Sequence, residues 1–167
     1  MRTIPDPGFT GDDGSVPAGV AEALGGYDAG GTDHRPALAV LQHARMLVPV
    51  VAVAGEVEYD EAGRPREKTS DMAAVLITGQ DGRRALLAFT GQEPMRRWDP
   101  AARPVPVTFA DAARAARQEG ADAVVVDVAG PVLFVVEGDD LGSLAQGDRL
   151  ARLGEQWAWV RPADPQG

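Results

Sequence analysis

Two valine-rich apolar runs stand out against an otherwise mixed pattern of apolar and polar residues. The first covers residues 46–53 (MLVPVVAV) and the second covers residues 123–128 (AVVVDV). Apolar runs of this length, without alternating polar positions, are typical of strands that are covered on both faces. Pro49 removes one backbone donor, so we expect a bulge there or an unpaired edge on one side. The two runs predict strands that lie side by side in one core.

The clearest local unit is a predicted hairpin followed by a helix. Residues 72–78 and 84–89 have apolar strand patterns, and the dipeptide Asp-Gly between them is a strong signal for a tight turn. Thr90 and Glu93 then have the spacing of a capping box, in which each side chain binds a backbone N–H at the helix start. The helix is predicted to end near Trp98, because an Asp-Pro pair follows it.

Four further helices are predicted from apolar residues at helical spacing, and they cover residues 15–23, 34–44, 109–119 and 139–145. Ser15 is the expected N-cap of the first helix. Thr108 and Asp111 form the expected cap of the third. The glycine-rich residues 25–31 are interpreted as a linker that follows the first helix.

Two short strands are predicted near the edges of the sheet. Pro104 precedes the run 105–107 and Pro106 lies within it, and their missing donors face the same side, which should therefore be a free edge. Trp157 and Trp159 alternate with a small residue in a final strand, which places both rings on one face. We expect these rings to pack against the core rather than to form a stacking platform.

Residues 55–70 are predicted to form a charged hairpin arm. Acidic side chains crowd its first half and basic side chains its second half. Antiparallel pairing would oppose Glu56 and Glu58 to Arg66 and Lys68. Exposed pairs of this kind contribute at most about 1 kcal/mol each, so we expect them to affect solubility and orientation rather than stability.

An internal similarity links the two halves of the chain. Residues 34–55 resemble residues 109–130, and residues 86–93 resemble residues 133–140. Both halves fit the order helix, strand, strand, helix, so a duplication is our hypothesis for their origin. The predicted fold class is α/β, with one mixed β-sheet of five to seven strands flanked by helices.

The length of 167 residues suits a single domain, and an apolar content of 44% is enough for a substantial core. The expected boundaries are an N-terminal arm with the first helix at residues 1–33, the α/β domain at 34–161 and a C-terminal tail at 162–167.

The net charge of −9 makes nucleic acid and membrane surfaces unfavourable partners, because both are anionic. There are no cysteines, so disulfides and thiol chemistry are excluded. The first residues lack the apolar segment of a signal peptide, and no apolar run approaches the roughly 20 residues of a membrane span. We therefore expect a soluble cytoplasmic protein.

The segment from about residue 37 to residue 145 resembles the N-terminal domain of the SseB family, the enhanced serine sensitivity proteins. The resemblance lies in the run MLVPVVAV, the strand-to-helix junction ALLAFTGQEPMRRW and the later stretch AVVVDVAGPVLFVVEGDDL. The opening IPDPGFTGDDGS and the stretch KTSDMAAVLITGQDGRRAL are similar to the actinobacterial branch. The family name records a growth phenotype, so the resemblance implies an α/β domain without an assigned activity or site residues.

Basic side chains gather in the middle of this acidic chain, where residues 64–103 carry eight basic and five acidic residues. Two arginine doublets, Arg83 with Arg84 and Arg96 with Arg97, are candidates for binding an anion or an acidic partner. The alternative is that they form an ordinary solvated rim.

Asp127 is the most unusual single residue, because it interrupts an apolar strand near its carboxyl end. Open α/β sheets often place ligand contacts at this position. The alternative is that its carboxylate accepts backbone donors from the turn at Ala129 and Gly130. No phosphate-binding glycine loop, activated serine or metal-spaced histidine pair is present, so we predict no cofactor and no metal site.

The sequence therefore favours a non-enzymatic binding or regulatory module over an enzyme. Its expected partner is another protein or a second copy of the chain, joined through a free strand edge. The alternative is a small enzyme in which Asp127 and Glu137 act as acid and base. A third hypothesis, RNA association through residues 83–97, is opposed by the net charge.

Overall fold

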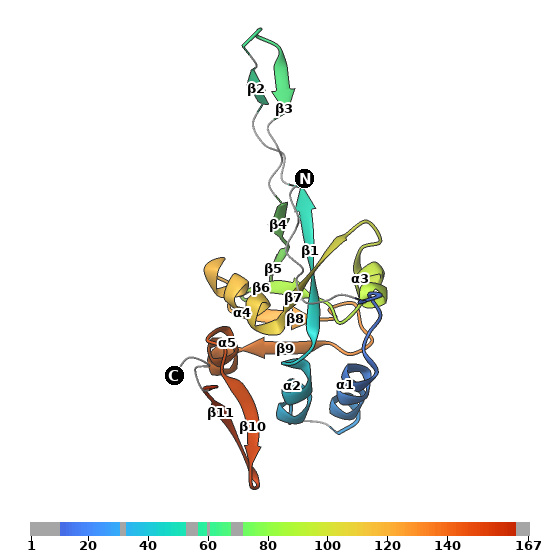
Figure 1. Cartoon of the computed structure of the whole chain (residues 1–167), viewed down its shortest axis with the longest axis vertical. Helices are drawn as coiled ribbons and strands as arrows, with labels where there is room; N and C mark the ends of the chain where they lie inside the picture. The colour runs from blue at the N-terminus through green and yellow to red at the C-terminus, as the bar shows by residue number, and fades with distance from the viewer. Residues whose placement is uncertain (1–10, 31–32, 53–56, 60, 68–71, 163–167) are drawn as a thin grey trace.

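The fold is given by a computed structural model, which describes residues 11–30, 33–52, 57–59, 61–67 and 72–162. In it, α-helices surround twisted β-sheets, and two hairpins extend from the body at opposite ends (Figure 1). The predicted α/β class is confirmed.

A four-stranded sheet carries the second valine-rich run. Its strands, in spatial order, are β5 (Leu76–Thr78), β6 (Arg84–Ala88), β8 (Ala123–Val126) and β9 (Phe134–Glu137). Strands β6 and β8 are parallel, and the other neighbours are antiparallel. This sheet is therefore mixed, as predicted, and the carboxyl ends of β6 and β8 lie at the same edge. It has four strands, and the described strands are divided among several sheets rather than forming the predicted single sheet of five to seven.

A three-stranded sheet carries the first valine-rich run, in the order β4 (Met72–Ala74), β1 (Arg45–Ala52) and β7 (Arg103–Thr108). A bridge between Leu47 and Phe89 joins it to the other sheet, with both N–H to O distances at 2.8 Å. The prediction that the valine-rich strands lie side by side is wrong, because β6 lies between β1 and β8. Both strands nevertheless contribute to the same hydrophobic core.

Pro49 lies opposite Pro104 in an uninterrupted register between β1 and β7, so the predicted bulge is absent. The alternative expectation holds, because the pairing of β1 with β4 begins only at Val50. Along an antiparallel strand, the backbone N–H and C=O groups of successive residues point alternately to the two sides of the strand. The N–H of Leu47 points away from β7, toward Phe89. Pro49 has the same orientation as Leu47, so its missing donor costs no bond to β7.

Five helices are described: α1 (Ala18–Gly30), α2 (Arg35–Leu41), α3 (Gln92–Trp98), α4 (Phe109–Gln118) and α5 (Gly138–Ala145). The Thr108 hydroxyl accepts the Asp111 N–H at 3.0 Å, which confirms the predicted cap of α4. The prediction for the first helix is wrong at both ends. Helix α1 begins three residues after Ser15 and continues through Gly25 and Gly26, so residues 25–30 are helical where a linker was expected.

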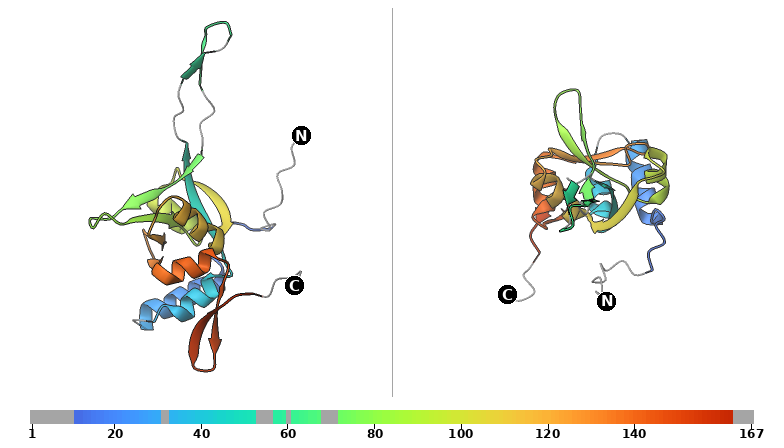
Figure 2. Two further views of the ribbon diagram at one scale, coloured as in Figure 1. Left: turned by 90° about the vertical axis from the view of Figure 1, so that its left-hand side faces the viewer. Right: turned by 90° about the horizontal axis from the view of Figure 1, so that it is seen from above.

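Two hairpins stand apart from the sheets. The charged arm pairs β2 (Val57–Tyr59) with β3 (Pro65–Glu67), and the predicted register of Glu58 opposite Arg66 is confirmed. Glu56 and Lys68 lie outside the described residues. The second hairpin pairs β10 (Arg149–Leu153) with β11 (Gln156–Val160), and it extends beyond the helices (Figure 2). The sequence pattern predicted β11 but not β10.

The core has two clusters on opposite faces of β6, as the two-residue period of a strand requires. Leu86 and Ala88 belong to the larger cluster, whereas Leu87 and Phe89 belong to the smaller one. The proposed duplication remains a hypothesis, because β8 and β9 form a full antiparallel pair while β1 and β6 share only the bridge.

Candidate functional site

The candidate site lies where the parallel strands β6 and β8 end. Ala88 pairs with Val126, and the Asp127 N–H donates to the Ala88 carbonyl at 3.0 Å. Asp127 then leaves the strand in the left-handed region, with φ of 54°. Ligands of open α/β sheets bind outside the carboxyl ends of the strands. The fold therefore places Asp127 at such a position.

Both carboxylate oxygens of Asp127 are held by one residue. The Thr90 N–H donates to Oδ1 at 2.8 Å, and the Thr90 hydroxyl donates to Oδ2 at 2.7 Å. Both residues are 1% exposed. The alternative expectation for Asp127 is therefore wrong, since its donors come from Thr90 and not from Ala129 or Gly130.

The same bonds explain why the predicted capping box is absent. Helix α3 has Gly91 as its N-cap, and no side chain caps it. The Thr90 hydroxyl is already used by Asp127, so it is not available to the helix. Glu93 instead accepts from Arg97 at 3.2 Å.

Burial raises the pKa of Asp127, because removal from water disfavours the charged form. The two hydrogen bonds from Thr90 act in the opposite direction, but burial has the larger effect.

Arg45 is a buried cation on the other side of Thr90, and sequence reasoning missed it. Its guanidinium donates to both carboxylate oxygens of Asp12, at 2.6 and 3.1 Å, and to the Ser15 carbonyl at 2.7 Å. It also donates to the Thr90 carbonyl. Its side chain is 7% exposed. Asp12, Arg45, Thr90 and Asp127 therefore form one connected set of polar groups.

This set fixes residues 11–16, which we call the arm, against the start of α3. The Gly14 carbonyl accepts the Gln92 N–H at 2.7 Å. Gly91 is required for this approach, because a Cβ there would lie 2.7 Å from Cγ2 of Val16. The hydrogen bonds from Arg45 lower the pKa of Asp12, so this carboxylate stays charged in the pair.

A pocket of about 340 Å³ lies beside Asp127. Its apolar walls come from the arm, α1, α3 and the segment after β8, through Val16, Ala21, Leu24, Pro94, Pro131 and Val132. Thr90, Asp127, Glu93 and Arg97 supply its polar groups, and Gly25 completes the α1 side. We call this the Asp127 pocket. Its volume lies at the lower end of the range for small-molecule sites.

The predicted arginine doublets are not brought together. Arg83 and Arg84 lie at the start of β6, where Arg83 pairs with Glu137 at 2.7 Å. Arg96 and Arg97 lie in the last turn of α3, beyond the other end of β6. Only Arg97 lines the Asp127 pocket. The two doublets are therefore too far apart to bind one small anion together.

Glu137 also lies far from Asp127, contrary to the acid–base alternative. It pairs with Ala123 at the start of β8, whereas Asp127 follows the end of that strand. Four residues of strand span about 13 Å. The two carboxylates therefore cannot act on one reacting atom in the present geometry.

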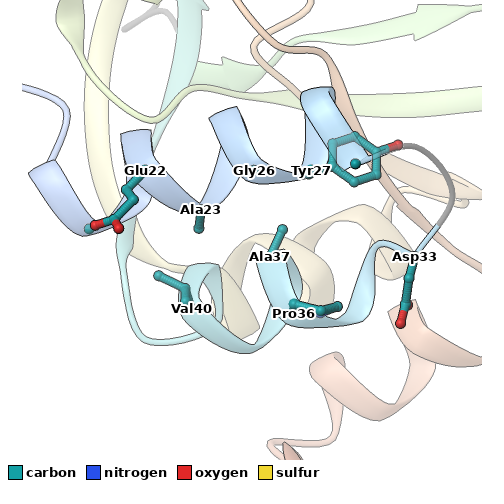
Figure 3. A pocket seen from close by; sticks show the side chains of 10 residues that line it. Glu22, Ala23, Gly26, Tyr27, Asp33, Pro36, Ala37 and Val40 are labelled. Atoms are coloured by element: carbon teal, nitrogen blue, oxygen red, sulfur yellow. The ribbon is translucent and has the colours of Figure 1, made fainter.

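A larger hollow of about 660 Å³ lies between α1 and α2. On the α1 side Glu22, Ala23 and Tyr27 line it together with glycines, and on the α2 side Pro36, Ala37 and Val40 line it (Figure 3). Glu22 and Asp33 are its only ionisable carboxylates. No buried polar group among its lining residues points to a ligand, so the Asp127 pocket is the better candidate.

A second polar contact joins the distant hairpin to the body. Asp140 accepts the indole N–H of Trp159 at 2.9 Å and lies 2.7 Å from Nε2 of His34. Trp157 and Trp159 both pack against the larger core cluster, so the expected packing role is confirmed. His43 takes no part in this contact.

Comparison with family models matches residues 20–143 to the SseB protein N-terminal domain. This match covers most of the chain, so the protein belongs to the SseB family. Neither the curated proteins nor the solved structures gave a match. Within the described residues, no helix is long and apolar enough to cross a membrane.

Proposed function

We propose that this SseB-family domain is a non-enzymatic binding module that holds a small ligand in the Asp127 pocket. The pocket lies outside the carboxyl ends of two parallel strands, which is the usual ligand position in α/β sheets.

The observation that supports this proposal is that hydrogen bonds within the protein already engage the Asp127 carboxylate. A general acid or base must reach the proton that it transfers. Both oxygens of Asp127 already accept hydrogen bonds from Thr90 at less than 3 Å. Asp127 therefore shapes the pocket wall and holds Thr90 in place, rather than reacting with a bound molecule.

The lining defines the chemical class of the ligand. Six apolar side chains form most of the wall, so the buried part of the ligand is aliphatic. Glu93 and Arg97 are exposed and pair with each other across one helical turn. They are positioned to meet a polar or charged end of the ligand at the mouth of the pocket.

Two neighbouring glycines of α1 provide a matched test. Gly25 lines the Asp127 pocket and Gly26 lines the hollow between α1 and α2. A Cβ at either position meets no atom within 4 Å, so the backbone accepts a side chain at both positions. Both substitutions raise helix propensity by a similar amount. Gly25→Leu fills the Asp127 pocket, whereas Gly26→Leu leaves it unchanged.

The experiment screens aliphatic carboxylic acids, amines and amides for a rise in the melting temperature of the wild-type protein. We expect hits whose effect is lost in Gly25→Leu and kept in Gly26→Leu. Equal binding by both variants, or loss in Gly26→Leu alone, would show that the Asp127 pocket is not the ligand site.

A further inference from the structure

The β10 edge of the hairpin of β10 and β11 is blocked at Leu150, whereas the β11 edge is open at Trp157 and Trp159. On β10, the side-chain amide of Gln42 accepts the Leu150 N–H and donates to the Leu150 carbonyl, both at 2.8 Å. The amide therefore replaces a neighbouring strand at Leu150. These bonds also show that the backbone groups of Leu150 point away from β11.

The outward orientation of the Leu150 backbone groups determines which residues of β11 also have outward-pointing backbone groups. Leu150 pairs with Trp159 and Arg152 pairs with Trp157. In an antiparallel pair, two directly opposite residues either bond each other or both point outward. The N–H and C=O groups of Trp157 and Trp159 therefore point away from β10. Within the described residues, no hydrogen bond to these four groups is found outside the hairpin.

The free edge predicted from sequence, on β7, is a poor docking site by comparison. It is an edge strand, as predicted. Two of its outward positions, however, are Pro104 and Pro106, which have no N–H to offer a partner. Prolines of this kind are a common protection against edge-to-edge pairing. Strand β11, with the sequence QWAWV, contains no proline, glycine or charge.

We propose that β11 pairs with β11 of a second copy of this chain, antiparallel and about a two-fold axis at Ala158. In this register Trp157 faces Trp159 of the second copy, and the reverse pair follows by symmetry. Each pair brings two outward N–H groups to two outward carbonyls, so all four groups of each strand are bonded. The two hairpins then form one four-stranded sheet, and the interface is isologous.

Charge complementarity favours a second copy as the occupant. Extending the register by two residues places Glu155 opposite Arg161 of the second copy, at both ends of the pairing. The Arg161 side chain is 72% exposed, and its present partners Asp148 and Gln146 lie on its own chain. Glu155 is exposed, and no ion pair with it is found among the described residues. The hairpin lies at one end of the molecule (Figures 1 and 2), and none of its residues lines the Asp127 pocket.

Two alanines of the hairpin test the proposal. Ala158 and Ala151 face each other within one hairpin and are both half-buried. Ala158→Lys brings two like charges together at the two-fold axis of the proposed dimer. Ala151→Lys places the two charges on the outer strands of the four-stranded sheet, three strand spacings apart. Sedimentation velocity over a concentration series measures the oligomeric state, and circular dichroism measures the fold. We expect a dimer for the wild type and Ala151→Lys, and a folded monomer for Ala158→Lys.

The charge pair supplies a second variant set. Glu155→Arg should weaken the dimer, and the double variant Glu155→Arg with Arg161→Glu should restore it. A wild-type protein that stays monomeric throughout the series overturns the proposal. So does a dimer that Ala158→Lys and Ala151→Lys weaken equally, since the interface would then lie elsewhere.

Discussion

Thr90 connects Arg45 and Asp127, which are the two buried ionisable side chains in the part of the chain that the structure describes. Its carbonyl accepts from Arg45, while its N–H and hydroxyl donate to Asp127. One residue thus uses three polar groups to join a cation and a carboxylate that are distant in the sequence. The sequence correctly singled out Asp127 as unusual, because a carboxylate in an apolar run is rare. It could not identify the partner, because the spacing of Thr90 and Glu93 also fits a local cap.

Replacement of Thr90 by valine removes the hydroxyl but keeps the shape of the side chain. We expect the free energy of unfolding to fall by about 1–3 kcal/mol, because one buried carboxylate oxygen loses its donor. Urea denaturation measures this change. Thr90→Ser is the control, since it keeps the hydroxyl and loses only a methyl group, at about 0.8 kcal/mol. A larger loss in the serine variant than in the valine variant would contradict the role of the hydroxyl.

The raised pKa of Asp127 makes the stability of the domain depend on pH. Burial lifts this pKa in the folded state above the value of about 3.9 for an unfolded chain. The folded state therefore holds the proton more tightly, and this contribution to stability is lost as pH rises through the raised pKa. We expect Asp127→Asn to gain stability relative to the wild type as pH rises from about 4 to 7. A difference that stays constant, or changes with the opposite sign, would exclude this explanation.

Local patterns predicted most of the elements, and the failures have identifiable causes. The hairpin of β5 and β6 and the cap of α4 are determined by residues close in sequence. Helix α1 continues through Gly25 and Gly26, and Tyr27 beyond them packs edge-on against the Phe134 ring, so tertiary packing outweighs propensity there. The arm depends on the contact between Asp12 and Arg45, which no local pattern reveals.

The attachment of the arm can be tested at Asp12. Asp12→Asn removes the charge that pairs with Arg45, and we expect a loss on the order of 1–2 kcal/mol because the pair is only partly buried. Hydrogen exchange at the Gln92 N–H should become faster, since its acceptor is the Gly14 carbonyl. Asp13→Asn is the matched control, because among the described residues the Asp13 carboxylate accepts hydrogen bonds only from Ser15. Equal acceleration in both variants would mean that Arg45 does not hold the arm.

The whole molecule is organised around β6, which divides the core into two clusters. The sequence predicted the α/β class and both apolar strands. It could not predict that β6 lies between them, because strand order depends on contacts between residues far apart in the chain. The bridge at Leu47 and Phe89 makes the two sheets one structural unit, and it lies one residue before Thr90.

The smaller cluster should therefore unfold together with the larger one. Phe89 is fully buried in the smaller cluster, with its ring centre 5.7 Å from that of Trp98. We expect Phe89→Ala to cost about 3–5 kcal/mol. Thermal unfolding followed by tryptophan fluorescence and by far-ultraviolet circular dichroism should shift by the same amount. Separate transitions for the two signals would show that the sheets unfold independently.

The most direct test of the proposed binding role is a chemical-shift map of the isotope-labelled protein with a ligand that raises its melting temperature. We predict that the largest changes fall on the amides of Gly25, Thr90 and Val132, which surround the Asp127 pocket. Changes concentrated at Gly26 and Val40 would instead place the ligand between α1 and α2, and would contradict the assignment of the site.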